Sequence, residues 1–93
     1  MRFEWDADKA ARNFETHGIS FEEASTVFGD QLARTDLDVH HSEVEERFIT
    51  IGLSLGGHLL VVWHTDQENG DVVRIIGARR SMPHERRAYE SGE

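Results

Sequence analysis

The chain has no cysteine, one proline (Pro83) and one lysine (Lys9) among its 93 residues. The absence of cysteine excludes disulfide bonds and thiolate metal sites, and it fits a reducing compartment. No apolar run reaches the roughly 18 residues of a membrane-spanning helix. The N-terminus carries Glu4, Asp6 and Asp8, where a secretory signal peptide has positive charge followed by an apolar stretch. We therefore expect a soluble, cytoplasmic protein that does not bind a membrane.

Positive charge is scarce in most of the chain and concentrated at its C-terminal end. Residues 1–73 contain five Lys and Arg against fifteen Asp and Glu, whereas residues 74–93 contain five against three. Nine of the ten cations are arginine, whose planar guanidinium can donate two parallel hydrogen bonds to one phosphate. The net charge of −8 argues against a free-standing nucleic-acid-binding protein, which gains affinity from a basic surface. It suggests instead that the acidic body binds a basic protein partner.

Hydrophobic periodicity and turn residues predict eight elements in one domain spanning residues 1–93. Asp6 or Asp8 is expected to cap the first helix, and Gly18 is expected to close it. Ser20 with Glu23 three residues later fits a capping box, and Ser81 is expected to cap the last helix. Turns are expected at Gly56-Gly57 and Asn69-Gly70. Strands are predicted at 2–5, 32–38, 45–55, 59–63 and 72–78, and helices at 6–16, at 21–28 and from about Pro83 onward.

The order of these elements is β-α-α-β-β-β-β-α, which predicts an α+β domain with a small antiparallel sheet and helices packed on it. Side chains alternate between the two faces of a strand. In the last strand, Arg74 and Arg80 are therefore expected on one face and Arg79 on the other. If the strand ends near Ala78, this alternation breaks and the three arginines can converge.

Short motifs run along nearly the whole chain, in order and with short gaps. They are Phe3 to Asp6, Lys9, Asn13, His17 and Gly18, Phe21 to Ala24, Val27 and Phe28, Glu46 to Phe48, Ile51 and Gly52, Leu60 to Val62, Arg74 to Ile76, Ala78 to Arg80, Glu85 and Arg86, and Tyr89 and Glu90. Together these motifs resemble the BrnT family of toxins.

The resemblance implies a type II toxin that acts as a ribonuclease and inhibits translation, with a fold similar to RelE-like ribonucleases. It also implies a DNA-binding antitoxin of the BrnA type with a ribbon-helix-helix fold, a toxin–antitoxin heterotetramer, and binding of operator DNA only through the antitoxin. Gly77 stands where family members often carry serine, which removes a hydroxyl but no ionisable group.

Cleavage of RNA without a metal needs a base for the 2′-hydroxyl proton, a cation beside the phosphorane, and an acid for the leaving 5′-oxygen. Histidine suits the base, because its ordinary pKa of about 6.5 leaves it mostly neutral near pH 7. His64 lies at the expected end of the central strand, where the sheet can present a cleft; a surface position without function is the alternative. Arg47, Arg74 and Arg79 lie on expected strands and match the family pattern, although Arg74 could equally pair with Glu46 on a neighbouring strand. The catalytic candidates are therefore Arg47, His64, Arg74 and Arg79.

Four further residues are candidates for binding RNA: Arg80, Arg86, Tyr89 and Trp63. Arg86 lies on the last helix, where a run of charges is more often a solvated face. Tyr89 can stack on a base or dock the helix on the sheet, and docking is favoured. Trp63 can be a core residue or a half-buried platform. Glu85 is expected to orient an arginine.

His40, His41 and Glu43 form a polar group in an acidic loop. Their spacing matches no standard zinc site, so we expect no metal and no other cofactor.

Two other functions are compatible with the sequence. The chain could be a co-repressor subunit that only holds a DNA-binding antitoxin, or an unrelated interaction module whose acidic face binds a basic protein. The substitution Arg79→Ala separates them. It should abolish growth arrest and leave complex formation intact in a ribonuclease, whereas neither binding protein arrests growth.

Overall fold

The structure, a computed structural model, describes residues 1–41 and 45–92. None of the helices in these ranges is long and apolar enough to cross a membrane. Apart from two short 3₁₀ segments, the order of elements is the predicted one, and the predicted helix at 21–28 is divided between α2 and a 3₁₀ turn. The elements are β1 (Arg2–Glu4), α1 (Ala7–His17), α2 (Phe21–Ser25), η1 (Thr26–Gly29), β2 (Arg34–Leu37), β3 (Phe48–Leu53), β4 (Leu59–Gln67), η2 (Glu68–Gly70), β5 (Val72–Arg80) and α3 (Pro83–Ser91).

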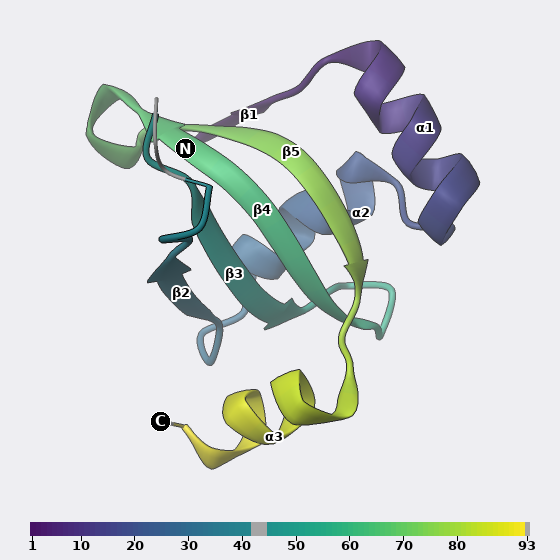
Figure 1. Ribbon diagram of the computed structural model, residues 1–93, viewed down its shortest axis with the longest axis vertical. Helices are drawn as coiled ribbons and strands as arrows, with labels where there is room; N and C mark the ends of the chain where they lie inside the picture. The colour runs from purple at the N-terminus through teal and green to yellow at the C-terminus, as the bar shows by residue number, and fades with distance from the viewer. Residues whose placement is uncertain (42–44, 93) are drawn as a thin grey trace.

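The five strands form one sheet in the order β1-β5-β4-β3-β2 (Figure 1). Strands β2 to β5 pair with one another in antiparallel fashion, as predicted. Strand β1 instead runs parallel to β5, with Arg2 opposite Val72. The prediction of a purely antiparallel sheet is therefore wrong. The prediction failed because it assumed a meander, in which strands that are consecutive in sequence pair with each other, whereas β1 pairs with the last strand, β5.

One face of the sheet, which we call the core face, is covered by α1, α2 and η1; Figure 1 shows α2 behind the strands. Asn13 joins α1 to β5, because its Nδ2 donates to the carbonyl of Ala78 at 2.8 Å and its Oδ1 accepts from the Ala78 N–H at 3.1 Å. The α+β prediction is confirmed. The buried cluster consists of Ile19, Phe21, Ala24, Val27, Leu60, Val62, Val73, Ile75 and Ala78.

Most helix ends follow local signals. The expected capping box of α2 is half formed, because the carboxylate of Glu23 contacts Ser54 and His58. Asp6 caps α1 by accepting from the Lys9 N–H at 3.0 Å, and Ser20 caps α2 by accepting from the Glu23 N–H at 3.0 Å. The expected cap of the last helix at Ser81 is wrong, because the N-cap is Met82. The Ser81 N–H continues the strand ladder by donating to the carbonyl of Leu59 at 2.9 Å. The helix itself begins at Pro83, as predicted, and only its cap lies one residue later.

A β-bulge interrupts the pairing of β4 with β5. Trp63 lies opposite Gly77, and the next residue, His64, lies opposite Ile75. Ile76 is the extra residue in β5. A single extra residue reverses the alternation of side chains beyond it.

The bulge decides which arginines share a face. Arg74 lies opposite Thr65, which has the same orientation as Trp63, and Arg79 lies two residues from the partner of Trp63. Arg74 and Arg79 therefore share the face opposite the core face, which we call the arginine face. Arg80 lies opposite Leu60 on the core face. The expected parity of the three arginines is wrong, because β5 runs on to Arg80 and changes parity at the bulge.

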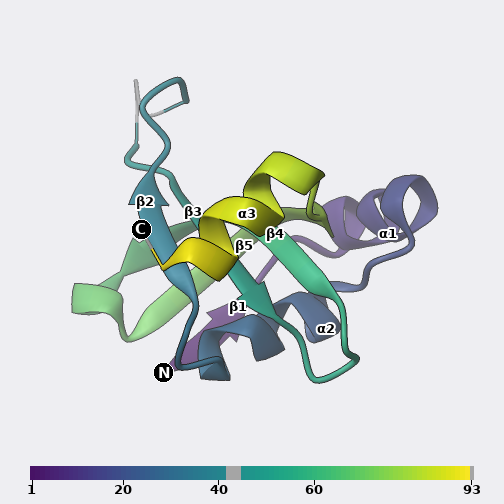
Figure 2. The ribbon, with the colours of Figure 1, turned by 90° about the horizontal axis from the view of Figure 1, so that it is seen from below.

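Helix α3 lies across one end of the strands, as Figure 2 shows from that end. Hydrogen bonds from Tyr89 and to Ala88 hold the C-terminal half of the helix there. The Tyr89 hydroxyl donates to Asp30 Oδ2 at 2.6 Å, and Arg34 Nη1 donates to the carbonyl of Ala88 at 3.1 Å. The C-terminal basic segment is thereby fixed at the end of the arginine face.

Candidate functional site on the arginine face

Arg79 is held on the arginine face by several contacts. Its Nη1 and Nη2 donate to Glu85 Oε1 and Oε2, both at 2.8 Å, and Nη1 also donates to the carbonyl of Arg80 at 3.1 Å. Its Cζ lies 5.1 Å from the centroid of the Trp63 ring, within the range of a cation–π interaction. The hydrogen bond to Glu85 raises the pKa of Arg79. The site therefore holds a permanent positive charge in a fixed direction.

Glu85, in the first turn of α3, orients the guanidinium of Arg79. Hydrogen bonding from Arg79 lowers the pKa of Glu85, as does the Met82 backbone, against an opposing effect of burial. The carboxylate accepts from the Met82 N–H at 2.7 Å while it holds Arg79. The expected contact between Glu85 and an arginine is present. One carboxylate thus both caps the helix and orients the guanidinium.

Arg34 lies in the same cross-strand row as Arg79, and the sequence analysis did not identify it. The register places Arg34 opposite Ile51, Ile51 opposite Val61, and Val61 opposite Arg79. The interaction of Arg34 with Ala88 then brings it under α3. The register of β2 against β3 would have revealed Arg34. The sequence of β2 alternates too weakly to predict that register.

Arg74 and Arg47 lie toward the other end of the sheet. Arg74 Nη1 is 3.4 Å from Glu4 Oε1, and the two side chains are 43% and 37% exposed. The partner is therefore Glu4 of the parallel strand β1 and not Glu46. Arg47 immediately precedes β3, and its carbonyl accepts from the Asp38 N–H at 2.7 Å. The structure thus separates these two arginines from Arg79, with the row of Trp63 between them.

His64 is 1% exposed and lies on the core face. Its Nε2 and Thr50 Oγ1 are 2.7 Å apart, and its Nδ1 lies 2.7 Å from Asp66 Oδ1. Burial lowers the pKa of His64, with the hydrogen bond to Asp66 acting in the opposite direction. The expected strand end at His64 is wrong, because β4 continues to Gln67. A ring that is enclosed in this way does not touch a substrate.

The four candidates for RNA binding lie in different places. Trp63 is half-buried beneath Arg79, and Arg80 is exposed at the end of β5 on the core face. Arg86 is exposed on α3, where its Nη1 lies 3.9 Å from Glu90 Oε2. The hydroxyl of Tyr89 docks α3 onto the body of the protein, as the favoured alternative expected. Of these four side chains, that of Trp63 contacts Arg79 directly, and Arg80 contacts Arg79 through its backbone carbonyl.

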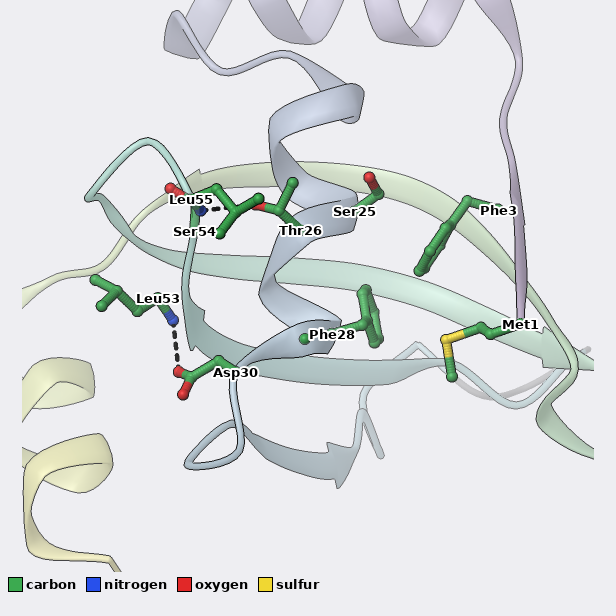
Figure 3. Close-up of a pocket in the computed structure, with 10 residues that line it drawn as sticks. Met1, Phe3, Ser25, Thr26, Phe28, Asp30, Leu53, Ser54 and Leu55 are labelled. Atoms are coloured by element: carbon green, nitrogen blue, oxygen red, sulfur yellow. Dashed lines mark hydrogen bonds between the residues drawn. The ribbon is translucent and has the colours of Figure 1, made fainter.

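A cavity of about 610 Å³ lies away from these arginines, beside η1 and the end of β3 (Figure 3). Its lining is mainly apolar and includes Met1, Phe3, Phe28 and Leu55. Its one carboxylate, Asp30, accepts from the Leu53 N–H at 2.8 Å. Such a lining suits apolar side chains and not a phosphate.

In the described part of the chain, no three His, Asp or Glu side chains are grouped to hold a metal ion. His41 Nδ1 lies 2.8 Å from Asp38 Oδ2. Glu43, the third member of the polar group noted in the sequence, lies outside the described residues.

Comparison with known proteins places the fold and the sequence in one family. The crystal structure of the Brucella abortus ribonuclease toxin BrnT is similar, with a TM-score of 0.66 and 19% identity over 88% of this chain and 97% of that chain. No curated protein matches the sequence. The similarity to RelE-like ribonucleases stays a prediction. The family described as ribonuclease toxin, BrnT, of type II toxin-antitoxin systems matches residues 5–85, and the chain therefore belongs to the BrnT family.

Proposed function

We propose that this chain is a metal-independent endoribonuclease that inhibits translation in the cytoplasm until a ribbon-helix-helix antitoxin neutralises it. The observation that carries the proposal is the arrangement of Arg79, which is held by Glu85 over the ring of Trp63. Membership of the BrnT family of ribonuclease toxins supports the reaction class. The role of each residue is our inference from its position.

The guanidinium of Arg79 keeps donors for a phosphate although it is paired. An arginine has five N–H groups, and the contacts to Glu85 and to the carbonyl of Arg80 use three of them. The remaining two, on Nε and Nη2, lie along one edge of the guanidinium. That edge can donate to two oxygens of a phosphate and stabilise the negative charge that develops on the phosphorane.

Trp63 and Arg74 extend the site along the sheet. Residues Val61, Trp63 and Thr65 of β4 fix three successive rows on the arginine face, and Arg79 and Arg74 belong to the first and the third. Successive rows are roughly 7 Å apart, twice the rise per residue of a strand. A nucleotide that contacts the edge of Trp63 therefore lies between the two arginines. The exposed pair of Arg74 with Glu4 is worth only about 0–1 kcal/mol, so a phosphate can replace the carboxylate.

The other arginines have supporting roles in this proposal. Arg47 adds positive charge at the Arg74 end, while Arg80 and the exposed Arg86 contact flanking phosphates. Tyr89 acts on RNA binding by holding α3 in place through Asp30.

The partner in this proposal is a BrnA-like antitoxin in a heterotetramer, which alone contacts operator DNA. Residues 1–73 carry an excess of ten negative charges, with five Lys and Arg against fifteen Asp and Glu, and this body suits a basic segment of the antitoxin. The apolar cavity beside η1 offers a seat for its hydrophobic side chains. We expect the antitoxin to cover the arginine face as well. A titration in which the complex cut RNA as fast as the free chain would contradict this arrangement.

The alternative is a co-repressor subunit that only binds its partner. The ion pair of Arg79 with Glu85 is the observation that favours it, because this pair occupies part of the guanidinium that would bind RNA. Inducible expression of the chain alone in a bacterium separates the two functions. The ribonuclease should arrest growth and degrade RNA, and Arg79→Ala should abolish both effects while antitoxin binding persists. Arg12→Ala, which changes an exposed arginine on α1, is the matched control and should remain toxic. Normal growth with intact RNA, from a chain shown to be folded, would support the binding-only function.

A further inference from the structure

A second cluster of ionisable side chains lies where the turn between β3 and β4 meets α2. Glu23 Oε2 accepts from Ser54 Oγ at 2.6 Å and contacts His58 Nδ1 at 2.7 Å. Ser54 Oγ in turn accepts from the backbone N–H of His58 at 3.1 Å. A Cβ at Gly56 would lie 2.7 Å from Glu23 Oε2, so the carboxylate is packed directly against the turn. These contacts fix the position of the imidazole.

The chemistry of the contact fixes the tautomer of His58. Hydrogen bonding from Ser54 lowers the pKa of Glu23, burial opposes this, and His58 and the charge of Arg80 lower the pKa further. An ionised carboxylate can only accept hydrogen bonds, so Nδ1 of His58 carries the proton. The lone pair of the neutral ring is then on Nε2.

The imidazole is accessible and has an arginine beside it. The side chain of His58 is 35% exposed, and its Nε2 makes no hydrogen bond within the described part of the chain. Arg80 lies opposite Leu60, two residues from His58 on the same side of the sheet, and such diagonal neighbours are within reach of a long side chain. A histidine with a fixed tautomer, a carboxylate and an arginine thus share one exposed edge.

We propose that His58 is the general base of RNA cleavage, with Glu23 as its positioning residue and Arg80 as the contact for the phosphate next to the scissile one. This inference rests on the proposed ribonuclease function. Nε2 of His58 takes the proton of the 2′-hydroxyl as the O2′–P bond forms and the P–O5′ bond breaks. The 5′-oxygen takes a proton from water, and His58 returns its proton to solvent. The products are a 2′,3′-cyclic phosphate and a 5′-hydroxyl.

The end of β5 connects this cluster to the arginine face. Arg79 and Arg80 are consecutive, and they lie on opposite faces of the sheet. An RNA strand that crosses this end can therefore contact Arg79 on one side and Arg80 with His58 on the other. His58 also provides an accessible histidine as the general base, whereas His64 is enclosed in the core.

The test is cleavage of a short single-stranded RNA by the purified full chain in EDTA, with His58→Gln compared with His41→Gln. His41 is the matched control, because its Nδ1 also contacts a carboxylate, that of Asp38 at 2.8 Å. We expect His58→Gln to lower kcat by about 100-fold or more, the range for loss of a general base, with RNA affinity unchanged. His41→Gln should cleave like the wild type. Glu23→Gln should lower kcat and shift the acid limb of the pH–rate profile, which a purely structural residue would not do.

The outcomes separate the two proposals. A folded wild-type chain that leaves RNA intact would overturn the ribonuclease function itself. An active wild type with His58→Gln cleaving within twofold of it would overturn the role of His58 and leave the ribonuclease function standing. If His58→Gln does not fold, the wild-type profile decides. Activity that rises with pH through one ionisation in the histidine range supports the base, and a flat profile from pH 5 to pH 8 overturns it.

Discussion

Arg79 and Glu85 are joined by two parallel hydrogen bonds of 2.8 Å, which tie the end of strand β5 to the first turn of α3. The pair places a permanent charge over Trp63 and leaves one edge of the guanidinium for another ligand. It thereby links the stability of the C-terminal helix to the proposed chemistry of the arginine face.

Replacing Glu85 should weaken the fold in a pH-dependent way. The folded-state pKa of Glu85 is lowered from 4.5, so its stabilising effect is complete above pH 4.5 and is lost as the pH falls through the lower folded value. Glu85→Gln should reduce the free energy of unfolding by about 1–2 kcal/mol at pH 7, and the difference from wild type should shrink toward pH 3. Urea unfolding at both pH values measures it. Glu90→Gln, whose contact with Arg86 is long and exposed, is the control, and an equal loss in both variants at pH 7 would contradict this role.

His64 should make the protein less stable in mild acid. Burial lowers its folded-state pKa from 6.5, so its effect is fully favourable above pH 6.5, and stability is lost as the pH falls toward the lower folded value. The wild type should lose free energy of unfolding between pH 7 and pH 5, and His64→Gln should lose less. Substitution of the exposed His40 by Gln should leave the wild-type slope. Chemical denaturation at three pH values gives the slopes, and identical slopes for wild type and His64→Gln would count against the buried-histidine account.

Gly52 should tolerate no side chain, because a Cβ there would lie 3.1 Å from the Cβ atoms of Ala33 and Val27 and 3.2 Å from the Val27 carbonyl oxygen. Gly52→Ala forces η1 away from β3, and we expect a loss of about 1–3 kcal/mol, the usual cost of overpacking. At Gly29 nothing lies within 4 Å of an added Cβ, so Gly29→Ala should stay within about 0.5 kcal/mol of wild type. Thermal and urea unfolding of the two variants compare them directly. Equal stability would show that the η1–β3 contact is loose.

Removing the Tyr89 hydroxyl should loosen α3. The hydroxyl donates to Asp30 at 2.6 Å, and this hydrogen bond raises the pKa of Tyr89. Tyr89→Phe should cost about 1 kcal/mol and speed hydrogen exchange of the α3 amides more than that of the β4 amides. Exchange measured by NMR shows the difference. Unchanged exchange in α3 would mean that Arg34 and Glu85 alone hold the helix.

Local signals predicted the elements well because their causes are local. Asp6, Ser20 and Gly18 mark helix ends by interactions within a few residues, and the structure shows each of them at such an end. The alternation of β3 and the two turns were likewise sufficient to place the meander. These features depend on no distant partner.

The features that organise the candidate site depend on contacts between distant residues. A three-residue strand such as β1 carries no signal for its direction, and nothing in the sequence marks Ile76 as the bulged residue that brings Arg74 and Arg79 to one face. The contact of Glu23 with His58 spans 35 positions. His64 was predicted at a strand end because the apolar run stops at Trp63, yet the strand continues to Gln67, and the ring of His64 has a buried partner in Thr50.

The most direct test of the ribonuclease account is cleavage of a labelled single-stranded RNA in EDTA by the purified wild type, Arg79→Ala and Arg12→Ala. The account predicts that the wild type and Arg12→Ala cut the RNA, and that folded Arg79→Ala is slower by about 100-fold or more, the usual effect of removing a donor to transition-state charge. Equal cleavage by folded Arg79→Ala, or intact RNA with the folded wild type, would contradict it.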